Sequence, residues 1–240
     1  MSAPRYAVYY APAAEQPLWR AGCVWLGRDA ADALDLRDPP ARRREPWRYG
    51  FHATLKAPFR LCPSLRESQL DAALQALAAR TPAFEMPVLA VDTLADFVAL
   101  RPAEALPRGH ALWRLADDCV RELDAFRAPP TPAELARRLA KPLEAGARLL
   151  LAQWGYPHVL DGWRFHITLS DSLPPTEREA MVREAQTHFA AALAQQPLRC
   201  SELCLFVQAA PGLPFVLQRR YALAAASAAV VSGSASDTTS

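Results

Sequence analysis

The sequence has little net charge and no long apolar run, and each shortage argues against a class of protein. Its 27 Lys and Arg against 25 Asp and Glu give a formal charge of +2 over 240 residues. A field strong enough to hold long nucleic acid or a membrane surface is therefore not expected. No apolar stretch reaches the roughly 18 residues of a membrane-spanning helix. The opening residues lack a basic segment followed by an apolar run, so we expect no signal peptide and a cytoplasmic protein.

Cysteines are few, odd in number and never spaced as Cys-x-x-Cys. No histidine or third cysteine accompanies any pair at zinc-ligand spacing, so neither a structural zinc site nor a disulfide framework is predicted. Free thiols are expected at all five positions, which are Cys23, Cys62, Cys119, Cys200 and Cys204. With 51% hydrophobic and 22% charged residues, the composition is typical of a soluble globular protein with a sizeable core.

Two of the five histidines lie in the same short pattern, at Phe51–Leu55 and again at Phe165–Leu169. Four of the five positions in the two copies are identical. In an extended strand, residues i and i+2 point to the same side, so each copy presents one imidazole and one hydroxyl together. These pairs are His52 with Thr54, and His166 with Thr168.

The pattern of apolar residues predicts a chain that contains both strands and helices. Strands are expected at 5–11, 51–61, 84–92, 96–101, 163–171, 198–208 and 214–223, and helices at 17–27, 64–80, 108–127, 132–153 and 175–194. Residues 37–48, rich in Pro and Arg, are expected to form an exposed loop.

Both motifs are followed by the same order of elements: strand, helix, strand, strand. The distance from His52 to Phe84 is 32 residues, as is the distance from His166 to Leu198. We therefore predict an internal duplication, with residues 1–223 forming one bilobal domain that has one motif in each lobe. The small, polar stretch 224–240 is expected to be a disordered tail.

Two imidazoles and two hydroxyls around one anion could perform acid–base chemistry on a phosphodiester. One histidine can activate water while the other protonates the leaving oxygen, and each such group typically contributes about 10²–10⁴-fold in rate. Threonine hydroxyls can donate to the non-bridging phosphate oxygens. The scheme needs neither a metal nor a cofactor, and none is expected. Two alternatives stay open, namely two unrelated core histidines and a two-histidine metal site completed by Asp171.

Other side chains near the motifs are weaker candidates for substrate binding. Lys56 and Arg164 share the motif faces if the strands are regular, and either could add positive charge beside a phosphate. Tyr49 and Tyr156 precede the motifs and could stack on a base or sugar. Alternatively, the two cationic side chains lie at solvated strand ends and the two tyrosines pack in the core. The arginines of the 37–48 loop could form a flap over an anion, or be simply solvated.

The paired motifs resemble the two-histidine (2H) phosphoesterase superfamily, which includes RNA 2′,3′-cyclic phosphodiesterases. The wider stretches 48–59 and 154–157 are similar to one bacterial branch, the 2H proteins found with phosphonate-degradation genes. The resemblance implies a bilobal α+β fold with two antiparallel sheets facing a central cleft and helices outside. It also implies His52 and His166 as the acid–base pair and Thr54 and Thr168 as phosphate binders.

These observations together predict a metal-independent phosphodiesterase acting on a small cyclic phosphodiester. A ribose cyclic phosphate linked to phosphonate catabolism is the candidate that the resemblance implies. An enzyme that processes RNA 2′,3′-cyclic phosphate ends is one alternative. A module that binds a nucleotide or phosphonate without turnover is the other.

Overall fold

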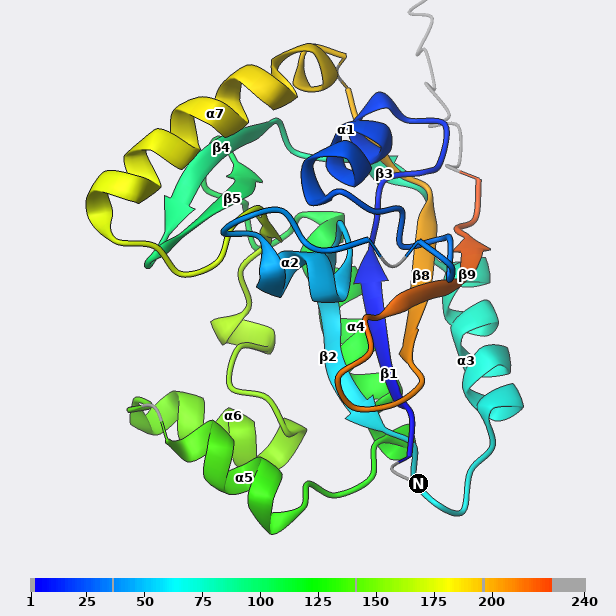
Figure 1. Cartoon of the computed structure of the whole chain (residues 1–240). Coiled ribbons are helices and arrows are strands. Elements are labelled where there is room, and N and C mark those ends of the chain that lie inside the picture. Colours follow the sequence, from blue (N-terminus) through cyan, green and yellow to red (C-terminus); the bar gives the residue numbers. More distant parts are fainter. Residues whose placement is uncertain (1–2, 36, 141, 196, 226–240) are drawn as a thin grey trace, which may run out of the picture.

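The computed structural model describes residues 3–35, 37–140, 142–195 and 197–225 (Figure 1). The strands are β1 (Arg5–Tyr10), β2 (Ala53–Arg60), β3 (Phe84–Glu85), β4 (Leu89–Leu94), β5 (Phe97–Pro102), β6 (Ile167–Thr168), β7 (Arg199–Cys200), β8 (Glu202–Gln208) and β9 (Val216–Ala222). The α-helices are α1 (Pro17–Leu26), α2 (Arg44–Tyr49), α3 (Glu67–Arg80), α4 (Ala111–Glu122), α5 (Pro132–Leu139), α6 (Ala145–Trp154) and α7 (Pro175–Leu193). Short 3₁₀ turns occur at Asp124–Phe126 and Leu160–Gly162.

The predicted α+β class is confirmed, but the two expected sheets are joined into one. Seven antiparallel strands follow the order β4-β5-β6-β2-β1-β8-β9, and β3 pairs separately with β7. The join is the pairing of the two motif strands, where Ala53 of β2 faces Ile167 of β6. This pairing gives each motif strand a hydrogen-bonding neighbour where two separate sheets would leave exposed edges.

The elements that follow the two motifs are exchanged between the halves of this sheet. Helix α3 follows the first motif but packs on β8 and β9, whereas α7 follows the second motif but packs on β4 and β5 (Figure 1). Each half of the sheet is therefore built from both repeats, with a helix from one repeat covering a hairpin from the other.

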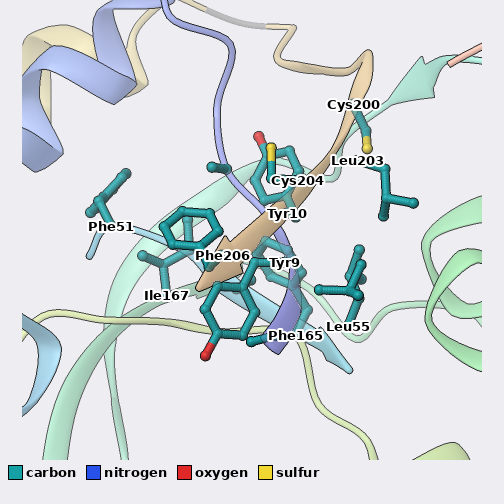
Figure 2. Close-up of a cluster of buried hydrophobic side chains, with 14 of the residues drawn as sticks. Tyr9, Tyr10, Phe51, Leu55, Phe165, Ile167, Cys200, Leu203, Cys204 and Phe206 are labelled. Atoms are coloured by element: carbon teal, nitrogen blue, oxygen red, sulfur yellow. The ribbon is translucent and has the colours of Figure 1, made fainter. Parts of the chain in front are cut away.

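The core lies around the central strands. Strand β1 is buried from Tyr6 to Tyr10, because elements cover both of its faces. Figure 2 shows part of this core, a cluster of buried side chains that includes Tyr9, Leu55, Ile167 and Phe206. A strand with both faces covered reads as a continuous apolar run, as the sequence of β1 does.

Phe51, the first residue of the first motif, is fixed by close packing. Its ring stacks on Phe189 of α7, with centroids 5.8 Å apart. It also fills the space beside Gly22 of α1, where a Cβ atom would lie 2.2 Å from the ring. Only glycine allows α1 and this aromatic ring to approach so closely.

Two predicted segments differ from the structure. The expected loop 37–48 contains α2, because the carboxylate of Asp171 accepts the backbone N–H groups of Glu45 (2.6 Å) and Arg44 (3.2 Å). A carboxylate at a helix N-terminus satisfies donors that have no partner within the helix. The expected helix 132–153 is divided into α5 and α6, and Pro142 lies between them.

The second motif strand is shorter than expected. Only two residues of the predicted strand 163–171 form β6. Before them, the indole Nε1–H of Trp163 donates to the backbone carbonyl of Thr54 (2.8 Å), so a side chain takes the place of a ladder hydrogen bond.

The predicted tail lies mostly outside the described residues, from 226 onward. Its first residue is anchored, since the backbone N–H of Ala83 donates to the carbonyl of Ala224 (2.8 Å). Among the helices that the structure describes, none is both long and apolar enough to cross a membrane.

Candidate active site

The two motifs meet at the join of the sheet, with their central residues Ala53 and Ile167 directly paired. Both central side chains are buried in the core, so the flanking side chains point to the opposite face. Because the strands are antiparallel, each imidazole lies opposite the threonine of the other motif. Opposed residues have Cβ atoms about 4.5–5.5 Å apart, and diagonal neighbours are about 7–8 Å apart. The two opposed pairs are His52 with Thr168, and His166 with Thr54.

Each imidazole is oriented by a carbonyl two residues before it. The Nδ1–H of His52 donates to the carbonyl of Gly50 (2.9 Å), and the Nδ1–H of His166 donates to that of Arg164 (2.8 Å). A carbonyl oxygen can only accept, so it fixes the proton on Nδ1 and leaves Nε2 of the neutral ring as the acceptor. The Nε2 atom of His52 lies 3.3 Å from Oγ1 of Thr54.

The backbone before the first motif has a conformation that requires glycine. Gly50 has φ 80° and ψ 175°, and a Cβ atom there would lie 2.6 Å from Cβ of Ala30. Its carbonyl is the one that holds His52. The ring of His52 is held from the other side by stacking on Tyr9, with centroids 3.7 Å apart and planes at 27°.

Both motifs open into a single cavity of about 490 Å³. Its lining residues are Arg5, Tyr9, Arg48, Tyr49, His52, Thr54, Ala57, Pro58, Arg138, Tyr156, His166 and Thr168. A second cavity of about 380 Å³ adjoins it, because Thr54, Tyr156 and His166 line both. The sequence therefore identified the four motif side chains that the structure brings together.

The surroundings of the two imidazoles favour their neutral forms. The pKa of His52 is lowered from 6.5 to about 4, mainly by loss of hydration. The hydrogen bond to Gly50 opposes this change, and the nearby His166 adds to it. Desolvation also lowers the pKa of His166, against the opposing effect of its bond to the carbonyl of Arg164. The ring of His52 is therefore neutral at neutral pH, with Nε2 as its proton acceptor.

Lys56 does not share the face of the motif, which corrects the prediction from strand alternation. Tyr9 pairs with Thr54, but the preceding residue Val8 pairs with Lys56, so Leu55 is an extra residue on β2. Such a bulge reverses the alternation of side chains beyond it. Lys56 consequently points to the opposite face of β2, against which α4 packs.

The buried amine of Lys56 has a structural role there. Its Nζ donates to the carbonyl of Val120 (3.1 Å) and to Asp124 (3.3 Å), and Arg127 contacts the same carboxylate. Burial lowers the pKa of the Lys56 amine, and the charge of Asp124 opposes this effect. Lys56 is therefore not a substrate-binding group of the cavity.

The remaining predicted residues lie at or near the site. Tyr49 lines the larger cavity and stacks on Phe215, with centroids 5.3 Å apart. Tyr156 lines both cavities, and burial raises the pKa of its hydroxyl. Arg164 is exposed and lines only the smaller one.

Two arginines of the segment before α2 are engaged with α7 rather than with the cavity. Arg42 forms an ion pair with Glu177 (2.8 Å), and Arg43 forms one with Glu184. Among the described residues, no three His, Cys, Asp or Glu side chains gather as a metal site. The five cysteines are free thiols.

Sequence reasoning did not identify Arg5 and Arg138 as cavity residues. Arg5 lies at the start of β1 and Arg138 lies on α5, far from either motif in the chain. No local pattern marks them, because only the packing of β1 and α5 around β2 brings them to the motifs.

Comparisons with known proteins find a matching family model, two similar relatives and several similar structures. The family model described as "Protein of unknown function (DUF1045)" matches residues 54–216. The chain is 37% identical over 232 residues to the ribose 1,5-bisphosphate phosphokinase PhnN of Janthinobacterium sp. (strain Marseille), covering 91% of this chain and 51% of the relative. It is 36% identical over 223 residues to the protein of the same name from Laribacter hongkongensis (strain HLHK9), covering 90% of this chain and 51% of that relative.

The chain thus spans about half the length of the curated relatives that it matches. Among solved structures, it is similar to E. coli LigT complexed with 3′-AMP, with a TM-score of 0.45 and 16% identity over 92% of this chain and 99% of that one. The crystal structure of a phosphoesterase is similar with a TM-score of 0.43 and 14% identity, covering 93% of this chain and 99% of that one.

Proposed function

The chain belongs to the family of proteins of unknown function DUF1045. For this member we propose the function of a metal-independent phosphodiesterase that opens a cyclic phosphate on a small ribose compound. The observation that carries the proposal is the cross-strand arrangement around Ala53 and Ile167, which gathers two imidazoles and two hydroxyls at one cavity. That set matches the groups that hydrolysis of a phosphodiester needs.

In this mechanism His52 is the general base and His166 is the general acid. Nε2 of the neutral His52 accepts a proton from water, and the water oxygen forms a bond to phosphorus. The bond from phosphorus to one ring oxygen breaks, and Nε2–H of protonated His166 gives its proton to that oxygen. The products are a phosphomonoester and a free hydroxyl group.

Substrate binding favours the protonated form of His166 that this mechanism needs. Desolvation lowers the pKa of both imidazoles, so both are neutral in the free protein at neutral pH. A bound phosphodiester anion favours the charged form of a neighbouring imidazole, so His166 takes up one proton from the solvent when the substrate binds. His52, with its pKa lowered to about 4, remains the neutral member of the pair.

The two threonines can bind the non-bridging oxygens of the phosphate. Each lies opposite an imidazole and lines the same cavity. Their β-branched side chains have few rotamers in a strand, so the hydroxyl groups are oriented before substrate binds. Donors positioned in advance favour the transition state, in which charge builds up on these oxygens.

A compact cyclic substrate suits the size and shape of the site. The cavity of about 490 Å³ is within the usual range for small-molecule sites. A five-membered cyclic phosphate is strained and carries its own leaving hydroxyl. The name of the curated relatives concerns a ribose phosphate, which supports a phosphorylated ribose as the substrate.

The kinase activity in that name is not assigned to this chain. The sequence contains no Gly-x-x-x-x-Gly-Lys-Ser/Thr stretch, the loop with which one large class of kinases holds nucleotide phosphates. Because the chain spans about half of each relative, that activity can belong to the other half of those proteins.

The test is a turnover assay with ribose cyclic phosphates, nucleoside 2′,3′-cyclic phosphates, linear diesters and RNA with cyclic phosphate ends. We expect turnover of the small cyclic compounds, and loss of most of it in His52→Ala and in His166→Ala. The double variant should be little worse than the worse single variant, since the two groups act as a unit.

A matched control is His110→Asn, because His110 lies outside the cavity and caps α4 by accepting from the N–H of Leu112 (3.1 Å). Asparagine is a favoured residue at this helix position, so this variant should keep full activity. Preference for polymeric RNA would favour the RNA-end function instead. Binding without turnover of any compound would identify a binding module.

A further inference from the structure

The cavity has more positive charge than a cyclic phosphodiester needs. Arg5, Arg48 and Arg138 line it, and no Asp or Glu is among its lining residues. A cyclic diester carries one negative charge, and the imidazoles and hydroxyls of the two motifs are already enough to bind it. The three arginines come from β1, α2 and α5, so the fold gathers them from separate elements.

Arg5 is held toward the cavity by a buried amide. Its Nε–H donates to Oε1 of Gln208 (2.7 Å), and Nε2–H of Gln208 donates to the carbonyl of Leu213 (2.5 Å). The side chain of Gln208 is only 2% exposed, and Arg5 also lies over the ring of Phe215 at 5.3 Å. A neutral partner orients the guanidinium group without neutralising its charge.

Arg48 is positioned by bonds to the backbone around it. The N–H of Phe215 donates to its carbonyl (2.7 Å), and the buried Arg28 donates to the carbonyls of Trp47 (2.8 Å) and Phe215 (2.5 Å). The side chain of Arg48 is 3.7 Å from Glu45, and the two are 38% and 56% exposed. Such a solvated pair is weak, so a bound anion can compete with it.

Arg138 approaches the cavity from α5. Its guanidinium carbon lies 6.0 Å from the centre of the Tyr156 ring, which lines the cavity beside the motifs. The arginine fork forms paired hydrogen bonds to phosphate oxygens, and its charge does not depend on pH in the usual range.

We propose that Arg5, Arg48 and Arg138 form a subsite for a second phosphate group, one that does not react. The substrate would then be a cyclic phosphodiester that also carries a phosphomonoester elsewhere on the same small molecule. This inference rests on the proposed function for the reacting group, but the subsite itself binds phosphate whether or not turnover occurs.

The test compares two ribose cyclic phosphates that differ only in a phosphate on O5. We expect wild type to have a higher kcat/KM for the phosphorylated compound by about tenfold to a hundredfold, the usual effect of hydrogen bonds to a charged group. Arg5→Gln, Arg48→Gln and Arg138→Gln should each reduce this ratio. Arg→Lys at the same positions, which keeps the charge, should restore part of it.

Arg44→Gln is the matched control, because Arg44 is an exposed residue of the same helix as Arg48 and does not line the cavity. It should keep the wild-type ratio. Equal kcat/KM for the two compounds, with turnover intact, would overturn the subsite and leave the proposed function standing.

A second measurement separates the subsite from turnover. Equilibrium binding of ribose 5-phosphate and of ribose is measured by calorimetry on wild type and on the glutamine variants. Binding of the phosphorylated sugar that is weakened in all three variants, but not in Arg44→Gln, supports the subsite even if no cyclic compound is hydrolysed. Absence of such binding in wild type would overturn it.

Discussion

Replacing His52 should change how the stability of the protein depends on pH. The pKa of this imidazole is lowered from 6.5 to about 4, so in the native state it stays neutral at a pH where the unfolded chain already binds a proton. Between these two values the unfolded state holds more protons, and acid therefore favours unfolding. The contribution of the neutral His52 ring to the free energy of unfolding is fully present above pH 6.5 and is lost as the pH falls toward 4.

The size of the effect follows from the two pKa values. At about 1.4 kcal/mol per pKa unit, the difference between the two pKa values corresponds to about 3 kcal/mol in the free energy of unfolding. Because the ring keeps some exposure to solvent, we expect about 2 kcal/mol in practice. For a protein of this size, each kcal/mol moves the melting temperature by about 2–4 °C.

The assay is urea unfolding of wild type and of His52→Gln at several pH values between 7.5 and 4. Glutamine is uncharged throughout, so the wild type should lose about 2 kcal/mol more than the variant across this range. Identical slopes for wild type and His52→Gln would refute the reasoning, as would an NMR titration that shows the His52 ring protonating near pH 6.5.

Three further outcomes are expected. Thr54→Val and Thr168→Val keep the shape of the side chain and should fold normally, but they should weaken phosphate binding and slow turnover by about tenfold or more; unchanged kinetics would make the hydroxyls structural. Gly50→Ala forces alanine into a positive φ and into contact with Ala30, which should destabilise the protein by about 1–3 kcal/mol. It should also lower kcat, because the carbonyl that orients His52 would shift. Urea unfolding and kinetics that match wild type would contradict this. Activity should survive treatment with a chelator, since the proposed chemistry uses only imidazoles and hydroxyls, and loss of activity that one divalent ion restores would favour a metal site.

The motif residues could be predicted because their geometry is local. His52 and Thr54 share a face in any extended strand, and a second copy of the pattern made a paired site the simplest explanation. The order of elements after each motif was predictable for the same reason. Apolar periodicity marks helices such as α3 and α7 without knowledge of what they pack against.

The parts that were missed depend on contacts between distant residues. Lys56 leaves the motif face because of a bulge that only the register with β1 defines. Helix α2 exists in an apparent loop because Asp171, more than a hundred residues away, caps it. Arg5 and Arg138 reach the cavity only through tertiary packing, and no spacing in the sequence marks them.

The exchange of helices and hairpins between the two halves of the sheet has a consequence for how the chain can be divided. A cut in the connection between α4 and β6 would separate the two repeats, yet neither fragment would contain a complete half. The first would hold α3 without the hairpin of β8 and β9 that it covers, and the second would hold α7 without β4 and β5. The fragments should be unfolded alone and assemble only with each other, so the two motif histidines come together only when the whole chain has folded.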